Sequence, residues 1–380
     1  MNSKERLVTA LNHQQPDRIP YDLGATFTSG IHANAYHKLR EFLELPQPLE
    51  DRFLCLDEQI VFIDEDIKQR LMIDTEPVLP GNPSTWNLLI EDKTDHSWYR
   101  NEWQMGLKMP KDGGFYYDVV DNPLAEAGID DLKYFPWPDP YDSTRYATLE
   151  QDVQQAAETG RAVIMNSISA GILEMSAWLI GYQRLFTGLL LEPEFLTALF
   201  DKILDIKLAY WETVLQRVGD KIDVVIEADD LAEQRQLLIS PRTYRKLVKP
   251  YHKQLYETIH SRTGAKIFHH SCGSVYALIP DLIEIGVDIL NPVQVNAANM
   301  DSAKLKAEFG RDIVFWGGAV DPQGTLNSGS PNQVYTETSR NIESLAKDGG
   351  FVFAAVHNIQ PNIPPQNIMA MWQALQDHRY

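Results

Sequence analysis

Short runs of consecutive apolar residues alternate with amphipathic segments through most of the chain after residue 160. The runs lack the alternation of half-buried strands, which is typical of strands buried on both faces of a sheet. They lie at residues 162–168, 222–227, 265–270, 287–291, 312–317 and 351–356. Segments with helical periodicity follow them, at residues 174–190, 193–218, 241–262, 274–285, 302–309, 331–347 and 364–377. This pattern predicts a parallel sheet covered by helices.

The first part of the chain adds two more strands to this pattern. One follows the turn at residues 17–20, and the other lies at 72–77; helical periodicity occurs at 3–12, 33–44 and 58–70. Eight strand–helix units predict an α/β fold of the (β/α)8 or TIM-barrel type, which we expect to form a single domain over residues 1–380. A doubly wound open sheet is the alternative, but no glycine-rich dinucleotide fingerprint follows any strand.

Residues 85–120 interrupt the strand–helix rhythm. Aromatic residues are interleaved there with polar ones, and the sequence Lys111-Asp112-Gly113-Gly114 is a turn signal. We therefore expect an antiparallel hairpin excursion from the barrel near these residues.

The net charge and the cysteine content argue against two classes of protein, those that bind nucleic acids and those built on disulfide bonds. A net charge of -19 over 380 residues lacks the basic footprint of a nucleic-acid-binding protein. Cys55 and Cys272 are the only cysteines, too few for a disulfide framework. The N-terminus has no signal-peptide pattern, and no apolar stretch is long enough to span a bilayer. We expect a cytoplasmic protein with neither nucleic acid nor membrane as partner.

The most informative local pattern is His270-Ser271-Cys272-Gly273 at the end of a predicted strand. Side chains alternate along a strand, so His270 and Cys272 can point to the same side, whereas His269 points to the other and is expected to be packed. An imidazole and a thiolate side by side are half of a plausible zinc site. A buried thiol beside a hydrogen-bonded histidine is the structural alternative.

Other polar residues recur at the carboxyl ends of the predicted strands, where sites of (β/α)8 barrels lie. Candidates at these ends or in the segments that follow are Asn166, Trp178, Asp229, Asp230, Asn291, Gln294 and His357. Paired carboxylates can bind a substrate, a proton or a metal, but Asp229 and Asp230 could also cap the following segment. Asn291 and Gln294 could equally hydrogen-bond the loop backbone.

Taken together, these strand ends resemble the uroporphyrinogen decarboxylase superfamily. The resemblance runs along nearly the whole chain and rests on Leu238-Ile239-Ser240-Pro241, His270-Ser271-Cys272-Gly273, Gly286 to Gln294, Phe315-Trp316-Gly317-Gly318 and His357-Asn358. It implies a (β/α)8 barrel. True uroporphyrinogen decarboxylases carry an N-terminal arginine cluster for substrate carboxylates, but the matching loop here, Tyr21 to Thr26, has no arginine.

The resemblance is closer to the zinc-dependent, corrinoid-linked methyltransferases of the superfamily, which carry a His-x-Cys pair at this place. It implies that His270 and Cys272 bind zinc. That branch usually has a cysteine after strand eight, where this sequence has His357, so either His357 completes the site or the zinc site is degenerate. Asp230 or Glu227 could complete this site. His357, Asp230 and Asp229 are the expected catalytic residues, and substrate contacts are expected from Tyr21, Asn166, Trp178, Asn291 and Gln294.

The leading hypothesis is therefore methyl transfer between a small methylated substrate and a corrinoid (cobalamin), carried by a partner corrinoid protein. One alternative is metal-independent decarboxylation of a smaller carboxylated substrate, with His357 and Asp230 handling protons. The other is a non-catalytic corrinoid- or tetrapyrrole-binding protein. The family resemblance also leads us to expect a homodimer.

Overall fold

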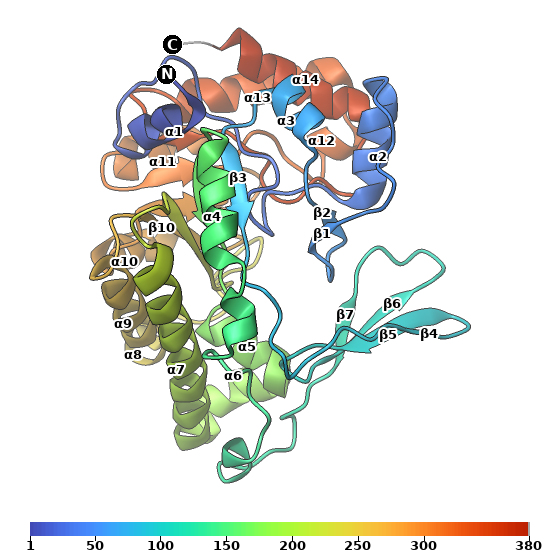
Figure 1. Ribbon diagram of the computed structural model, residues 1–380. Helices are drawn as coiled ribbons and strands as arrows, with labels where there is room; N and C mark the ends of the chain where they lie inside the picture. Colours follow the sequence, from blue (N-terminus) through green and yellow to red (C-terminus); the bar gives the residue numbers. More distant parts are fainter. Residues whose placement is uncertain (379–380) are drawn as a thin grey trace.

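The centre of the molecule is a curved sheet of seven parallel strands, seen in a computed structural model that describes residues 1–378 (Figure 1). The order across the sheet is β13-β12-β11-β10-β9-β8-β3, so strands that follow one another in the chain lie side by side. Their bounds are β3 (Thr75–Val78), β8 (Ala162–Met165), β9 (Val224–Ala228), β10 (Lys266–His270), β11 (Ile289–Asn291), β12 (Val314–Trp316) and β13 (Phe351–Val352).

The segment around Tyr21 closes this sheet into a barrel. Tyr21 pairs in parallel with Phe353, just past β13, and the Asp22 amide donates to the Phe353 carbonyl at 2.9 Å. On the other side, the Asp74 amide donates to the Tyr21 carbonyl at 2.8 Å, just before β3. This segment therefore occupies the place of the first predicted strand, and the (β/α)8 prediction is confirmed.

Helices cover the outside of the barrel and mostly begin and end near the predicted residues. They are α1 (Ser3–Leu11), α2 (Ala33–Phe42), α3 (Glu65–Leu71), α4 (Leu149–Glu158), α5 (Ile172–Ile180), α6 (Tyr182–Leu191), α7 (Pro193–Val218), α8 (Pro241–Leu247), α9 (Lys249–His260), α10 (Ile279–Glu284), α11 (Ser302–Phe309), α12 (Thr325–Ser328), α13 (Pro331–Leu345) and α14 (Pro365–Asp377). Short 3-10 turns lie at Asp131–Lys133, Ser143–Tyr146 and Tyr276–Leu278.

Four details of the helices differ from the prediction. The segment 241–262 forms two helices that meet at Val248, because Pro250 in the first turn of α9 has no amide to donate to the preceding turn. The segment 174–190 likewise divides at Gly181, and α4 lies where no helix was expected. The predicted helix over 58–70 is shorter, since residues 53–61 form the small hairpin β1 (Phe53–Cys55) and β2 (Ile60–Val61).

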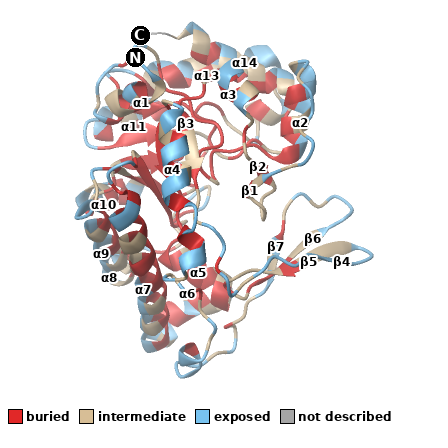
Figure 2. Cartoon of the chain, viewed as in Figure 1, coloured by how far each residue is buried: buried red, intermediate tan, exposed pale blue. Residues whose placement is uncertain are grey.

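Two apolar layers hold the barrel together, one inside it and one between the strands and the helices (Figure 2). Phe268 and Trp316 meet edge to face inside the barrel, with ring centroids 5.3 Å apart. The buried carboxylate of Asp22 accepts from the Trp316 indole at 2.9 Å and from the Thr75 hydroxyl at 2.8 Å. Buried polar groups need such partners, so these bonds join three barrel strands.

The predicted excursion is an antiparallel sheet of four strands, β4 (Glu91–Asp92), β5 (His96–Arg100), β6 (Gly106–Pro110) and β7 (Asp118–Asp121). It stands out from the barrel beside β1 and β2 (Figure 1). Two contacts to Asp57 attach it: the Tyr117 amide donates to the Asp57 carbonyl at 2.8 Å, and the Tyr99 hydroxyl donates to the Asp57 carboxylate. The position of this sheet therefore depends on the loop between β1 and β2.

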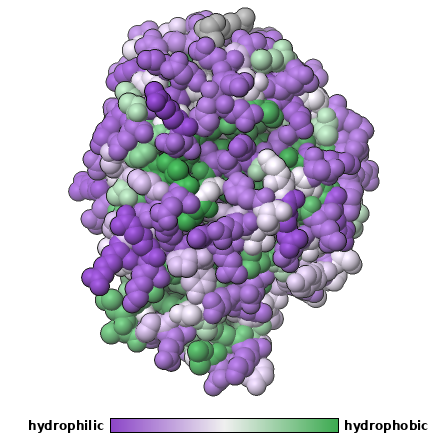
Figure 3. All heavy atoms as spheres, turned by 90° about the vertical axis from the view of Figure 1, so that its left-hand side faces the viewer, coloured by the Kyte–Doolittle hydropathy of each residue, from purple (hydrophilic) through white to green (hydrophobic). Residues whose placement is uncertain are grey.

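The outer surface is mostly hydrophilic on the face shown in Figure 3, with apolar side chains near the middle of that face and toward its lower end. Among residues 1–378, no helix is long and apolar enough to cross a membrane.

Candidate metal centre at the barrel mouth

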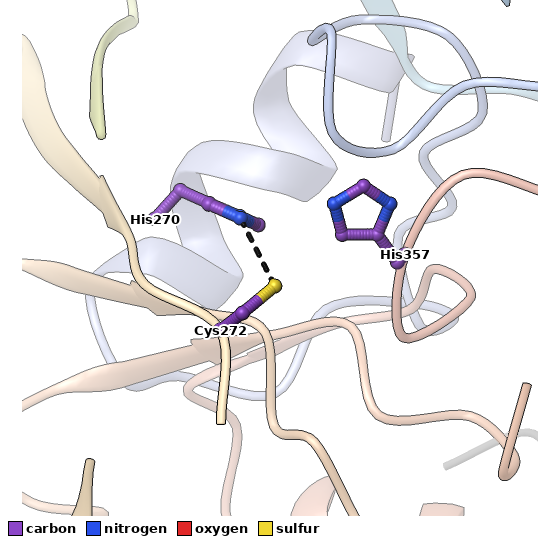
Figure 4. A group of neighbouring side chains, drawn as sticks. All are labelled: His270, Cys272 and His357. Atoms are coloured by element: carbon purple, nitrogen blue, oxygen red, sulfur yellow. Dashed lines mark hydrogen bonds between the residues drawn. The ribbon is translucent and has the colours of Figure 1, made fainter. Parts of the chain in front are cut away.

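Three side chains converge at the carboxyl ends of the strands: His270 at the end of β10, Cys272 two residues later, and His357 after β13 (Figure 4). Their ligand atoms all lie within 4.8 Å of one another. Cys272 Sγ is 3.4 Å from His270 Nε2, and the two imidazole ring centroids are 5.4 Å apart. Within the described part of the chain, no other cluster of at least three histidine, cysteine or acidic ligand atoms is as close.

Asn291 determines which nitrogen of His270 faces Cys272 with a free lone pair. Asn291 Nδ2 donates to the carbonyl of Trp316 at 2.9 Å, and a carbonyl can only accept. The amide oxygen must then face His270 Nδ1, 2.6 Å away, so Nδ1 carries the proton and donates. His270 Nε2 is therefore the unprotonated nitrogen, which is the form that binds a metal.

This donor set fits zinc. Two imidazoles and one thiolate are common zinc ligands, and catalytic zinc has three protein ligands and one open position. Tetrahedral zinc places a nitrogen and a sulfur ligand roughly 3.5 Å apart. The Nε2–Sγ distance of 3.4 Å matches this spacing. His357 is half-buried and forms no hydrogen bond within residues 1–378, so its ring is available as the third ligand.

The turn after Cys272 depends on Gly273. Its φ is +86°, and a Cβ atom there would meet the Glu233 carbonyl oxygen at 2.5 Å. The Gly273 amide donates to Gln294 Oε1 at 2.7 Å, and Gln294 Nε2 donates to Gln234 at 2.7 Å. Both ends of the Gln294 side chain are thus engaged in holding this turn, and the structure shows no free group for the substrate contact expected of it.

The two predicted aspartates have different places. Asp230 lies at the cluster: it accepts from the Cys272 amide at 2.7 Å, and its Oδ1 is 3.8 Å from His270 Nε2. Asp229 is buried and faces α5, where its two oxygens accept from the Leu173 and Glu174 amides at 3.0 and 2.8 Å. One of them is also 2.8 Å from His252 Nε2. Asp229 therefore caps α5, a helix that precedes it in the chain, whereas the structural alternative named the segment that follows.

Other expected site residues lie away from the cluster. Asn166 is buried at the end of β8 and donates to the carbonyls of Ala25 and Val78 at 3.0 and 3.3 Å. Tyr21 packs against the Phe353 ring in the layer between strands and helices. Tyr21 is therefore separated from the mouth by the strand itself, and Asn166 is fully buried with its amide nitrogen engaged by backbone carbonyls.

Glu227, considered as a further zinc ligand, forms a buried ion pair instead. Its carboxylate is 2.9 Å from Lys207 Nζ, and both side chains are almost completely buried. It also accepts from the Trp211 indole at 2.5 Å and the Ser167 hydroxyl at 3.1 Å.

His269 was expected to point away from His270 and to be packed. Its Nδ1 shares a hydrogen bond of 2.6 Å with the Tyr256 hydroxyl, in the layer between the strands and the helices.

Two further carboxylates lie at the mouth and were not predicted. Glu174 is in the first turn of α5, the helix that follows β8, and Glu58 is in the loop between β1 and β2. Asn358 Nδ2 donates to Glu58 at 2.5 Å, next to His357. A carboxylate in the first helical turn after a barrel strand is a signal that could have indicated Glu174. No signal indicated Glu58, because its segment was assigned to a helix.

Burial and the neighbouring acids control ionisation at the mouth. Burial, followed by Asp230, Glu174 and Glu58, raises the pKa of Cys272 well above its usual value. The pKa of Glu174 is raised in the same way by burial and then by Asp230. Burial and the nearby His357 lower the pKa of His270 to about 3, so this imidazole is neutral. Within residues 1–378, no lysine or arginine nitrogen lies within 4.0 Å of Glu58, Glu174 or Asp230.

Comparison with known proteins agrees with this architecture. A model of the family described as uroporphyrinogen decarboxylase (URO-D) matches residues 102–378. A methyltransferase from Methanosarcina mazei has a similar fold, with a TM-score of 0.63, 17% sequence identity, and an alignment covering 99% of this chain and 99% of that one. No curated protein sequence matches the chain significantly.

Weaker structural likenesses are to glycoside hydrolases. Native xylanase 10B from Thermotoga maritima gives a TM-score of 0.37 and 11% identity over 61% of this chain and 80% of that one. A β-glucosidase mutant derived from a hyperthermophilic tetrameric structure gives 0.45 and 11%, over 97% of each chain. These scores are too low to bear on the activity of this chain.

Proposed function

The chain belongs to the uroporphyrinogen decarboxylase family, and on this premise we propose that it is a zinc-dependent methyltransferase. Its reaction moves a methyl group between a small methylated substrate and a corrinoid (cobalamin), which a partner protein carries. The observation that supports this most is the convergence of His270, Cys272 and His357 at the barrel mouth. The methyltransferase from Methanosarcina mazei, with the same fold, agrees with it.

The residues of the mouth have different roles in metal binding. His270, Cys272 and His357 would hold the zinc, and three protein ligands are what a catalytic zinc requires. Asn291 keeps the proton of His270 on Nδ1, and Gln294 holds the turn that carries Cys272. A bound zinc supplies Lewis-acid polarisation of the methylated heteroatom or stabilises a thiolate, and the corrinoid supplies the cobalt that carries the methyl group.

Asp230 is the residue best placed to handle a proton. Its Oδ1 lies 3.8 Å from His270 Nε2 and is fixed by the Cys272 amide. It can therefore take up a proton from a group that enters beside the ligands, or hold the substrate in line. Trp178 is half-buried on α5, four residues after Glu174, and is the proposed aromatic contact for the substrate.

Decarboxylation of a carboxylated substrate is less well supported. An anionic substrate needs a cationic anchor, and arginine is the side chain that binds carboxylates best. The carboxylates at this mouth lack a lysine or arginine within 4.0 Å, as far as residues 1–378 extend. Such a substrate would therefore lack a cationic anchor at this mouth.

The test compares the two cysteines of the chain. The purified protein should contain close to one zinc per chain by elemental analysis, and Cys272→Ser should lose it. Cys55→Ser is the matched control and should keep its zinc, because Cys55 lies in β1 outside the cluster. With zinc bound, the protein should methylate cob(I)alamin from a small methyl donor. A metal-free protein with full activity, or equal zinc in both variants, would refute the proposal.

A further inference from the structure

A row of buried hydroxyl groups joins Asn291 to a carboxylate in the barrel interior. The Thr28 hydroxyl donates to Asn291 Oδ1 at 3.4 Å, and the Thr28 amide donates to Thr26 Oγ1 at 3.1 Å. Thr26 Oγ1 lies 2.8 Å from Ser29 Oγ, which donates to Asp22 Oδ2 at 2.6 Å. All of these side chains are buried. Each hydroxyl hydrogen has an acceptor in this arrangement, so the row is continuous from Asn291 to Asp22.

A second connection joins the other end of the Asn291 side chain to the same carboxyl oxygen. Asn291 Nδ2 donates to the Trp316 carbonyl at 2.9 Å, and the Trp316 indole donates to Asp22 Oδ2 at 2.9 Å. The other oxygen of Asp22 accepts from the Thr75 hydroxyl at 2.8 Å and from the Ala25 amide at 3.1 Å. The two connections form a closed ring of hydrogen bonds, in which Asp22 is the fixed point.

This ring determines how the Asn291 amide is turned. Asn291 Oδ1 faces two donors, His270 Nδ1 and the Thr28 hydroxyl, whereas its Nδ2 faces the Trp316 carbonyl. An amide turned by half a rotation would point its NH2 group at both donors and its oxygen at a carbonyl, and buried groups mismatched in this way are costly. Thr28 therefore adds to the preference for the orientation in which His270 keeps its proton on Nδ1.

We propose that Thr28, held through Thr26 and Ser29 on Asp22, is a positioning residue of the metal centre. It fixes the Asn291 amide and thereby the orientation of the His270 ring that binds zinc. The outer partners of metal-binding histidines act in this way, by orienting the ring and raising its basicity. This inference rests on the proposed function, since it assumes that His270 binds zinc. Thr28 acts only through Asn291, because it is not among the converging ligand atoms.

Two variants interrupt the row at different places, and a third serves as the matched control. Thr28→Val removes the hydroxyl beside Asn291, and Ser29→Ala detaches the row from Asp22. Thr75→Val removes a hydroxyl that donates to the other oxygen of the same carboxyl group, outside the row. Zinc affinity, measured by competition with a chromophoric chelator, should fall about three- to tenfold in the first two, less than for loss of a direct histidine partner. Thr75→Val should bind zinc as tightly as the wild type.

Two further measurements distinguish positioning of the metal ligand from a general loss of stability. The double variant Thr28→Val/Ser29→Ala should bind zinc no more weakly than the weaker single variant, because one interruption already disconnects the row. The visible absorption bands of the cobalt-loaded protein report the geometry of the ligands. They should change in Thr28→Val and Ser29→Ala and stay as in the wild type in Thr75→Val. Urea denaturation of the metal-free proteins establishes that all of the variants are folded.

Three outcomes would overturn the inference and leave the proposed function standing. They are wild-type zinc affinity in Thr28→Val and Ser29→Ala, an equal loss of affinity in Thr75→Val, and losses that add in the double variant. A wild-type chain that binds no zinc would overturn the proposed function and this inference with it.

Discussion

Replacing Asn291 with leucine tests whether one hydrogen bond sets the metal-binding form of His270. The two side chains are buried, and His270 Nδ1 donates to Asn291 Oδ1 at 2.6 Å. Leucine has a similar volume but no acceptor. The Nδ1 proton is then either left unpaired or moved to Nε2, which removes the lone pair that faces Cys272. The first outcome removes the partner that orients the ring and raises its basicity, and the second removes the lone pair that a metal needs, so both weaken metal binding.

The size of the effect follows from these contacts. Loss of a partner that orients a metal-binding histidine costs about 10- to 100-fold in affinity, which corresponds to about 1.4–2.8 kcal/mol. The metal-free protein should also lose about 1–3 kcal/mol of its free energy of unfolding, because the His270 donor and the Trp316 carbonyl both lose a partner. Zinc affinity is measured by competition with a chromophoric chelator, and stability by urea denaturation.

Asn166→Leu is the matched control for this experiment. Asn166 is equally buried at the end of β8, and its side-chain amide donates to two carbonyls. It should lose similar stability but keep the zinc affinity of the wild type. If Asn291→Leu binds zinc as tightly as the wild type while His270→Ala does not, the assignment of the His270 tautomer is refuted.

Three further predictions concern stability. Gly273→Ala should cost more free energy of unfolding than Gly113→Ala, and should also weaken zinc binding. Both glycines have a positive φ, which costs roughly 1–2 kcal/mol for alanine, but only Gly273 would collide with another backbone atom. Lys207→Met should cost about 3–5 kcal/mol, because it leaves the buried Glu227 carboxylate unpaired. Asp57→Asn should flatten the pH dependence of stability, since burial raises the pKa of Asp57 to about 7.

The sign of the Asp57 effect follows from proton binding. Between the pKa of an unfolded aspartate, about 3.9, and its folded value of about 7, the folded chain holds a proton that the unfolded chain has released. Stability contributed by this group therefore falls as the pH rises through that window. Urea denaturation at several pH values should show Asp57→Asn gaining stability relative to the wild type as the pH rises.

Each of these predictions has an outcome that contradicts it. Equal losses in the two glycine variants would mean that the contact with Glu233 is not decisive. A loss after Lys207→Met no larger than after substitution of the exposed Lys253 would show that the Lys207–Glu227 pair is not held as described. A stability difference between wild type and Asp57→Asn that does not change with pH would contradict the raised pKa of Asp57.

Much of the fold follows from local patterns in the sequence. Apolar runs without alternation identified the barrel strands, and the interleaved aromatic residues identified the hairpin excursion, because burial on both faces or on one face dictates these patterns. Local patterns gave a wrong prediction where one residue interrupts a periodic segment: a single helix was expected over 241–262, but Pro250 separates α8 from α9. They also missed α4 and the β1–β2 hairpin.

The candidate site could be predicted only in part. The strand period places His270 and Cys272 on one side of β10, and the barrel topology places them at the same pole as His357 and Asp230. The period could not show that Asp229 is turned toward α5 while its neighbour Asp230 faces the ligands. Nor could it place Glu58, which reaches the mouth through Asn358, a residue 300 positions away in the chain.

The sequence by itself determined the strand–helix order, the type of barrel and the identity of the His-x-Cys pair, because these depend on residues close together in the chain. Only the tertiary structure decided which polar residues share the mouth and which are engaged elsewhere. It assigned Asn291 to the proton of His270, Gln294 to the turn after Cys272, and Asp229 to the first turn of α5. The physical reason is that hydrogen bonds and charges act through space, between segments that the sequence separates.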